Sequence, residues 1–217
     1  MKNTAMKKQL LGLCFSAFAA SALANTGDDV YHVQTQWAVA NYELSGDDQE
    51  KAFTTLVEEV ENLTKANPKS ADLWIWSGIV KSSFAGVKGG LGALSLAKQS
   101  RADLERALQL DAGALQGSAY TSLGALYSKV PGWPVAFGSG KKARELFAKA
   151  LKINPQGIDS NYFYAEFMYD EGEYREAEKH YLLAQRAAPR PDRPLADAGR
   201  QKEISAGLEK VRKKLDH

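Results

Sequence analysis

Apolar residues recur at helical spacing along most of the chain, and this pattern predicts consecutive pairs of helices. Even residues 73–80, which are apolar and aromatic enough for a strand, have helical periodicity. The predicted pairs span about 28–44 and 47–66, 70–85 and 97–110, 113–129 and 140–153, and 158–171 and 173–187. A final amphipathic helix is predicted over about 195–215, with Arg200 on its charged side and an apolar side formed by Leu195, Ile204, Leu208, Val211 and Leu215.

The second helices of the last two pairs repeat one another at a spacing of 34 residues. In each copy, small residues flank one aromatic residue and a proline follows. The matching positions are Ala143, Phe147, Ala150 and Pro155, and then Ala177, Tyr181, Ala184 and Pro189. Alanine lets two helices approach closely, the aromatic ring fills the space beside it, and proline stops the helix. This spacing therefore predicts a stacked helical repeat.

The first helix of the third pair carries a further repeat signature. Tyr120, Leu123, Gly124 and Tyr127 follow the pattern W-x2-L-G-x2-Y, with Tyr in place of Trp. Over about residues 35–190 the chain resembles the tetratricopeptide repeat (TPR) family. The resemblance implies an all-α fold, a right-handed α-solenoid of about four TPR-like helical hairpins. The expected hairpins are 28–68, 69–112, 113–155 and 156–189, with the helix 195–215 as C-terminal cap.

Two of the four repeats are enlarged between their helices. The family spacing between the small residues of the two helices is about 12 positions. Here it is 22 from Gly78 to Ser100 and 19 from Gly124 to Ala143. The first addition, residues 85–93, contains four glycines and is predicted to be a flexible loop. Because both additions fall at the same point of the repeat, we expect them side by side on one edge of the solenoid.

The second addition, residues 130–138, places Trp133 and Phe137 where a solvated loop would carry polar residues. Pro131 and Pro134 restrict its backbone. In one interpretation both aromatic side chains fold back over their own hairpin. In the other they line a pocket or a partner-binding edge. Because burying a Trp side chain is strongly favourable, we expect Trp133 to be covered in either case.

The concave face of such a solenoid is formed mainly by first helices, and we expect it to carry little charge. Its candidate binding residues are Ile75, Ile79, Thr121, Tyr162, Glu166 and Tyr169. A mixture of small, apolar and aromatic side chains suits a peptide or a hydrophobic ligand better than a polyanion. The alternative is that Ile75 or Tyr162 packs between repeats.

The first 24 residues are typical of a secretory signal peptide, which leaves 25–217 as a single helical domain. Its features are the basic residues Lys2, Lys7 and Lys8, the apolar run 10–20, and the cleavage pattern Ala22-Leu23-Ala24. We therefore expect cleavage after Ala24, a periplasmic or secreted protein, and no stable membrane span. Without the three lysines the formal charge changes from +2 to about −1, which gives no reason to expect a nucleic-acid partner.

The sequence offers little for catalysis or metal binding. Cys14, the only cysteine, lies inside the predicted signal peptide and follows Leu13, which does not fit a lipoprotein signal. None of His32, His180 and His217 lies in a metal-binding pattern, and His180 is expected to be solvated. The chain has no Gly-x-Ser-x-Gly elbow and no phosphate-binding loop. We therefore expect a protein that is not an enzyme and that takes neither a metal nor a cofactor.

The leading functional hypothesis is an exported scaffold that binds another periplasmic protein or a peptide through its concave face and enlarged loops. In addition, residues 128–138 and 154–163 resemble the helical, TPR-like T-component associated with some tripartite (TRAP) solute transporters. This second resemblance covers about residues 70–200. It implies a periplasmic accessory that binds a solute-binding protein or a small apolar ligand. Many members carry a lipid anchor, and this sequence departs from them in having no matching lipoprotein signal.

Overall fold

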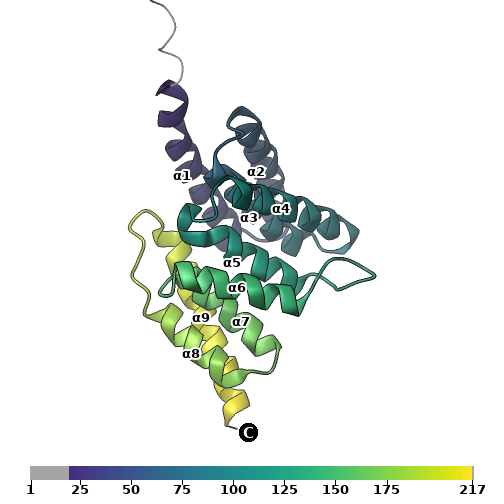
Figure 1. Ribbon diagram of the computed structural model, residues 1–217, viewed down its shortest axis with the longest axis vertical. Coiled ribbons are helices and arrows are strands. Elements are labelled where there is room, and N and C mark those ends of the chain that lie inside the picture. Colours follow the sequence, from purple (N-terminus) through teal and green to yellow (C-terminus); the bar gives the residue numbers. More distant parts are fainter. Residues whose placement is uncertain (1–19, 217) are drawn as a thin grey trace, which may run out of the picture.

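Nine α-helices make up the part of the chain that the computed structural model describes, residues 20–216 with side chains from residue 26 (Figure 1). They are α1 (Ala20–Tyr42), α2 (Gly46–Ala66), α3 (Ala71–Lys88), α4 (Gly90–Leu110), α5 (Ala114–Lys129), α6 (Gly140–Ile153), α7 (Ile158–Asp170), α8 (Tyr174–Gln185) and α9 (Pro194–Leu215). Among the described residues the one β-type contact is an isolated bridge between Gly132 and Gly138. The predicted all-α fold class is confirmed.

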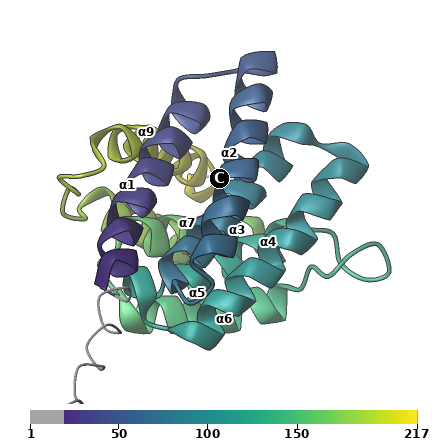
Figure 2. The same ribbon diagram turned by 90° about the horizontal axis from the view of Figure 1, so that it is seen from above.

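The helices pack as consecutive hairpins. Helix α1 pairs with α2, α3 with α4, α5 with α6 and α7 with α8. The first helices of successive hairpins also contact one another, α1 with α3, α3 with α5 and α5 with α7. Figures 1 and 2 show the hairpins following one another along the molecule. The predicted array of four helical hairpins and a final helix is therefore confirmed.

Small residues allow the two helices of each hairpin to approach closely. A Cβ at Gly78 would lie 2.5 Å from Leu104 Cγ, and one at Gly124 would lie 2.9 Å from Phe147 Cε1. Phe147 and its counterpart Tyr181 are buried, and so are the alanines that flank each of them. The residues that recur at the 34-residue spacing therefore form the hairpin cores, as the spacing predicts.

A buried polar cluster replaces the apolar repeat signature in the second hairpin. Ser77 and Lys81 stand where the signature has Leu and Tyr, and both are buried. Ser77 Oγ donates to Asp103 Oδ2 at 2.7 Å, and Lys81 Nζ donates to the same oxygen at 2.8 Å. Lys81 also pairs with Glu61 of α2 at 3.2 Å. Charge-assisted hydrogen bonds thus join α2, α3 and α4 at this position.

Helix α9 covers the open end of the last hairpin. Ile204, Leu208 and Val211 are buried in the same core as α8, as the amphipathic pattern predicts. The ring of Tyr181 lies against Gly207, where a Cβ would be 2.5 Å from ring atoms. Gly207 of α9 therefore packs against an aromatic residue of α8, just as Gly124 of α5 packs against Phe147 of α6.

Helix α9 also returns to the first helix. It contacts both α1 and α7, and Tyr42 at the end of α1 packs against Gly199. The Tyr42 hydroxyl donates to Glu203 Oε2 at 3.3 Å. Burial raises the pKa of Tyr42 to about 12, so this hydroxyl stays protonated and remains a donor. The two ends of the array meet here, and α9 and the connector 186–193 bound the concave side.

The two enlarged repeats project from the same side of the molecule, as expected, in both Figure 1 and Figure 2. The prediction that the first addition is a loop is wrong, because α3 continues to Lys88 and α4 begins at Gly90. Gly89 and Gly90 have φ angles of 64° and 59°, which allow the tight reversal between the helices. Phe84 and Leu96 are buried close to this turn. Their packing overrides the low helix propensity of the nearby glycines.

Most of the predicted signal peptide falls outside the described residues. Its basic start, nearly all of its apolar run and Cys14 precede Ala20, where α1 begins. Among residues 20–216, no helix is both long enough and apolar enough to cross a membrane. Export and cleavage after Ala24 remain predictions from the sequence.

Candidate binding cavity and exposed loop edge

A cavity of about 1140 Å³ lies on the concave side of the array. Its wall is built by the first helices α1, α3, α5 and α7, by the connector between α8 and α9, and by α9. The apolar part of the lining includes Trp37, Ile79, Leu126 and Phe163. Sites for small molecules usually measure about 300–1,000 Å³, so this cavity has room for a small ligand or for the end of a peptide chain.

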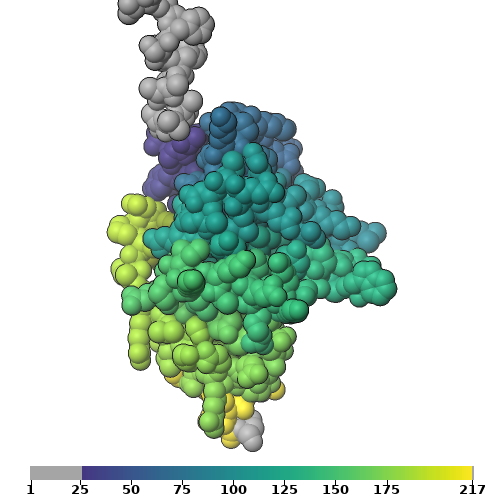
Figure 3. Space-filling model, in the orientation of Figure 1, coloured from purple at the N-terminus to yellow at the C-terminus, as the bar shows by residue number. Residues whose placement is uncertain are grey.

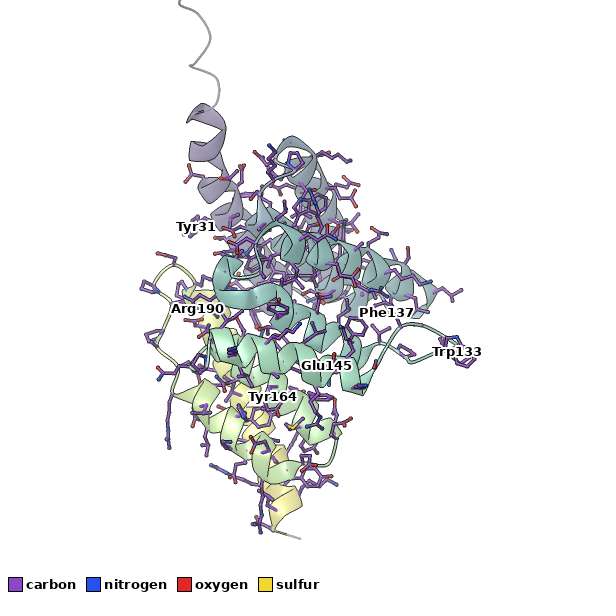
Figure 4. All side chains as sticks on the ribbon, in the orientation of Figure 1. Tyr31, Trp133, Phe137, Glu145, Tyr164 and Arg190 are labelled. Carbon is purple, nitrogen blue, oxygen red and sulfur yellow. The ribbon has the colours of Figure 1, made fainter. Side chains whose placement is uncertain are left out.

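An ion-pair network forms the side of the cavity next to the connector, where Figure 4 labels Arg190. Asp159 at the start of α7 accepts hydrogen bonds from Arg200 Nε at 2.9 Å and from Arg190 Nη1 at 2.6 Å. Arg200 also binds Glu203 at 2.6 Å, and Arg190 binds Asp197 at 2.7 Å. These bonds attach the connector to α7 and α9. The prediction that the concave face carries little charge is therefore wrong.

Arg200 is the central residue of this network. The prediction that it lies on the solvent-facing side of the last helix is wrong, because it is 6% exposed and its guanidinium lies 4.3 Å from the centroid of the Tyr162 ring. Burial disfavours the charged form of Asp159, but Arg200 and Arg190 outweigh burial and hold the pKa of Asp159 well below its usual range. The ion pairs therefore persist at neutral pH.

Trp133 lies at the tip of the loop 130–139, which protrudes from the edge of the molecule (Figures 3 and 4). Its side chain is 89% exposed. Phe137 lies nearer the body, with its ring centroid 5.3 Å from that of Tyr127 and 5.1 Å from the guanidinium carbon of Arg101. Phe137 thus folds back over its own hairpin and Trp133 does not. The expectation that Trp133 is covered is wrong for this chain on its own.

Backbone hydrogen bonds hold this loop in shape. Gly138 N donates to Pro131 O at 2.9 Å, and Ser139 N donates to Tyr127 O at 2.9 Å. A Cβ at Gly138 would collide with the carbonyl of Val130, so the two arms of the loop can cross only at a glycine. These hydrogen bonds therefore hold the loop that carries Trp133 in place.

Of the residues predicted on the concave face, Ile79, Thr121 and Tyr162 line the cavity. Ile75 does not, because it is completely buried between hairpins in a core that includes Leu104. The alternative interpretation, packing between repeats, therefore describes Ile75. The binding roles of the three lining residues stay predictions.

Glu166 and Tyr169 are not among the residues that line the cavity. The Tyr181 hydroxyl donates a hydrogen bond to Glu166 Oε1. Tyr169 packs against Tyr174, with 5.5 Å between the ring centroids. Both residues have contacts within the last hairpin, and their binding roles stay predictions.

His180 is buried, with 8% exposure, so the prediction that it is solvated is wrong. Its ring nitrogens bond Asn161 Oδ1 at 2.8 Å and Glu176 Oε1 at 3.1 Å. Its ring packs edge-on against Tyr164, with 4.6 Å between centroids. Burial lowers the pKa of His180, and Glu176 opposes this shift only in part. The position of Glu176 four residues earlier is visible in the sequence, whereas the partners on α7 are not.

Trp76 and Arg193 are among the residues of the cavity wall that the sequence pattern did not indicate. The guanidinium carbon of Arg193 lies 5.0 Å from the centroid of the Trp76 ring. Two features of the sequence could have pointed to them, namely the arginines of the proline-rich segment 190–194 and a Trp inside the apolar run 73–80. Within the described part of the chain, no group of three or more His, Cys, Asp or Glu side chains is placed to hold a metal ion.

Residues 135–202 match the family model of the tetratricopeptide repeat. The matched segment runs from the Trp133 loop through α6, α7 and α8 into α9, and it includes both copies of the 34-residue spacing. Proteins with this repeat generally serve as non-catalytic scaffolds for protein interactions. The comparison with curated proteins found no match.

Proposed function

We propose that this protein is an exported, non-catalytic scaffold that binds a partner protein through the edge that carries Trp133. The exposure of this side chain, 89%, is the observation that carries the proposal. Val135 in the same loop is 63% exposed, and Leu91 at the neighbouring α3–α4 tip is 87% exposed. Both tips project from the same side of the molecule (Figures 1 and 2). We call Leu91, Trp133 and Val135 the apolar edge.

An exposed Trp on a loop that is held by backbone hydrogen bonds has the properties of a binding hot spot. Trp is enriched among residues that dominate interface energetics, and a buried Trp removes roughly 150–250 Å² from water. The hydrogen bonds of Gly138 and Ser139 and the packing of Phe137 hold the loop before any partner arrives. Binding would therefore cost little conformational entropy.

The cavity on the concave side is partly open to solvent, and α9 and the connector 186–193 bound it on one side. A folded partner needs an accessible surface, which the apolar edge offers. We therefore place partner docking at the apolar edge and leave the cavity for a small ligand or a chain end.

Affinity capture from a periplasmic extract tests whether the protein binds a partner through the apolar edge. The baits are the wild-type protein without residues 1–24, the variant Trp133→Ala, and the control Tyr31→Ala. Tyr31 is 54% exposed on α1 and lies far from the apolar edge (Figure 4). We expect one protein to be enriched by the wild type and the control and at least about ten-fold less by Trp133→Ala, which corresponds to about 1.4 kcal/mol. Equal enrichment by all three baits, or none by the wild type, would contradict the proposal.

The cavity favours a second candidate, a periplasmic accessory of a TRAP-type solute transport system that binds a small apolar ligand or a solute-binding protein. Its support is the cavity of about 1140 Å³ together with the resemblance of residues 128–138 and 154–163 to the T-component. Denaturing the purified protein and extracting it with organic solvent should release an apolar molecule in near-stoichiometric amount. Finding no such molecule by mass spectrometry counts against ligand binding.

Export is supported by the basic start, the apolar run and the Ala22-Leu23-Ala24 pattern. Cell fractionation followed by N-terminal sequencing tests it. We expect the protein in the periplasmic or secreted fraction with Asn25 as its first residue. A cytoplasmic protein that still begins at Met1 would show that the first 24 residues are not a cleaved signal.

A further inference from the structure

The tip of the loop 130–139 is a narrow apolar segment without charge. Trp133 is 89% exposed and Val135 is 63% exposed. Every residue from 130 to 140 has an uncharged side chain. Because apolar surface of this size is unfavourable in water, the tip suits an apolar recess on a partner, and it needs no counter-ion there.

The cavity on the concave side is a recess of this kind. It measures about 1140 Å³ and is partly open to solvent. Its wall includes Ile79, Leu115, Tyr162 and Phe163, which offer apolar and aromatic surface to an indole ring. The volume exceeds the range of about 300–1,000 Å³ that is usual for small-molecule sites. A narrow loop tip with several side chains can therefore enter it.

Helix α5 also offers the cavity accessible hydrogen-bond acceptors. The hydroxyls of Ser118, Thr121 and Ser122 line the cavity and have no hydrogen-bond partner within the part of the chain that the structure describes. None of these three oxygens is completely enclosed by protein atoms, so a group in the cavity can reach them. Hydroxyl oxygens accept hydrogen bonds, and the indole N–H of a buried Trp needs such an acceptor.

The charges of the cavity wall favour an uncharged occupant. Most of the charged residues in the lining form ion pairs, namely Lys129, Asp159, Arg190, Arg200 and Glu203. Arg186 and Asp192 are exposed, have opposite signs and form no ion pair with any described residue. The wall therefore selects neither an anion nor a cation, and an uncharged loop tip leaves its ion pairs intact.

The loop and the cavity of one molecule cannot meet. Figure 4 labels Trp133 and Arg190 at opposite edges, and Figures 1 and 2 show the loop 130–139 and the connector 186–193 on opposite sides. None of residues 130–139 lines the cavity. The loop of one copy can therefore reach only the cavity of another. Because two different surfaces meet, such a contact is heterologous and builds a ring or an open chain of copies.

We propose that the Trp133 loop of one copy inserts into the concave cavity of a second copy, so that the protein assembles head to tail. This inference rests on the proposed function, because it takes the apolar edge as the docking site and names a second copy of this chain as the partner. In the assembly Trp133 packs against the apolar lining, and its indole N–H donates to a hydroxyl of α5. A small ligand in the same cavity would exclude the loop.

Sedimentation velocity of the protein without residues 1–24, from low to high micromolar concentration, is the first test. The mean mass of the wild type should rise with concentration above that of a monomer. Trp133→Ala should raise the dissociation constant at least ten-fold, whereas the exposed control Tyr31→Ala should self-associate like the wild type. A wild type that is monomeric at every concentration overturns the proposal, and so does association that Trp133→Ala leaves unchanged.

Two complementary variants distinguish head-to-tail assembly from contact between two loops. Ser122→Trp fills the cavity and keeps the loop, whereas Trp133→Ala keeps the cavity and lacks the tip. Each variant alone should be monomeric, and their mixture should form a complex of one copy of each and nothing larger. Self-association of Ser122→Trp as strong as that of the wild type would show that the cavity is not the docking site, and would overturn the proposal.

Disulfide cross-linking decides the question if circular dichroism shows that Ser122→Trp is unfolded. The protein without residues 1–24 has no cysteine of its own, and Ser122→Cys is a small change. A mixture of Val135→Cys and Ser122→Cys should form the mixed cross-linked pair at least ten-fold faster than Val135→Cys with the control Tyr31→Cys. Equal rates in the two mixtures overturn the proposal.

This inference and the proposed function fail separately. A monomeric wild type that still captures a different protein through Trp133 would overturn assembly with a second copy and leave the scaffold proposal intact. If assembly is head to tail, the protein that the capture experiment enriches is the endogenous copy of this chain. An apolar molecule released in near-stoichiometric amount from the purified protein would identify a small ligand as the occupant of the cavity, and would overturn insertion of the loop.

Discussion

Gly199 of α9 lies so close to Tyr42 of α1 that a Cβ at position 199 would be 2.4 Å from the ring carbon Cδ1. The two residues belong to the last and the first helix of the array. Glu203, on the same side of α9, accepts a hydrogen bond from the Tyr42 hydroxyl at 3.3 Å. The closure of the concave side therefore depends on the absence of a side chain at position 199.

Gly199→Ala is expected to lower the free energy of unfolding by about 1–3 kcal/mol, because the added methyl forces Tyr42 or α9 to move. Gly86→Ala is the control, since a Cβ at Gly86 meets nothing within 4 Å. Alanine inside the α3 helix should stabilise the protein by about 0.5–1 kcal/mol. Urea unfolding followed by circular dichroism measures both variants. A Gly199→Ala protein as stable as Gly86→Ala would refute the close contact.

Asp103→Ala is expected to cost about 3 kcal/mol, because it leaves Lys81 buried without its closest counter-ion and leaves Ser77 without its acceptor. Glu209→Ala removes an exposed carboxylate that pairs with Lys213 on α9, and should leave the denaturant midpoint nearly unchanged. Denaturant midpoints of the two variants give the comparison. Similar losses in both would mean that the buried cluster contributes no more than a surface pair.

Trp133→Ala is expected to leave the free energy of unfolding unchanged within about 0.5 kcal/mol, because its side chain is 89% exposed. Phe137→Ala should cost about 1 kcal/mol, since it removes the ring contact with Tyr127. Thermal unfolding of both variants separates the two sequence interpretations of this loop. A drop of several degrees for Trp133→Ala would restore the interpretation in which Trp133 packs on its own hairpin.

The stability of the protein is expected to fall as the pH is lowered from about 7 to about 5, in part because of His180. Burial lowers the pKa of His180 in the folded state, whereas an unfolded His binds a proton near pH 6.5. The contribution is therefore complete above about pH 6.5 and is lost as the pH falls through the lower folded pKa. His180→Gln keeps a side chain that can bond Asn161, and urea midpoints at several pH values should show a shallower slope. An identical slope in both proteins would exclude His180 as a source of the pH dependence.

The repeated core could be predicted because the constraint on it is local. Phe147 and Tyr181 lie in equivalent hairpins, and each must be buried between small residues of its own helix and the neighbouring one. The segment 85–93 was interpreted wrongly for the opposite reason. Its glycines favour a loop by propensity, but Phe84 and Leu96 are buried in one core with residues of α1 and α2, and this packing keeps the segment helical.

The candidate site could be predicted only where it follows from position in the repeat. Ile79, Thr121 and Tyr162 belong to first helices, and first helices form the concave side. Arg193 and Trp76 meet across the cavity although they lie on the connector and on α3. No pattern of spacing along the chain predicts that two such residues meet.

From the order of its residues, the chain could be known as an array of helical hairpins with two enlarged tips on one side and an amphipathic last helix. Whether that last helix covers only its neighbour or also reaches the first helix depends on small rotations that accumulate between successive hairpins. In this molecule they bring Gly199 against Tyr42 and turn Arg193 and Arg200 towards a shared cavity. Such placements come from packing across the whole array, which no short segment of sequence encodes.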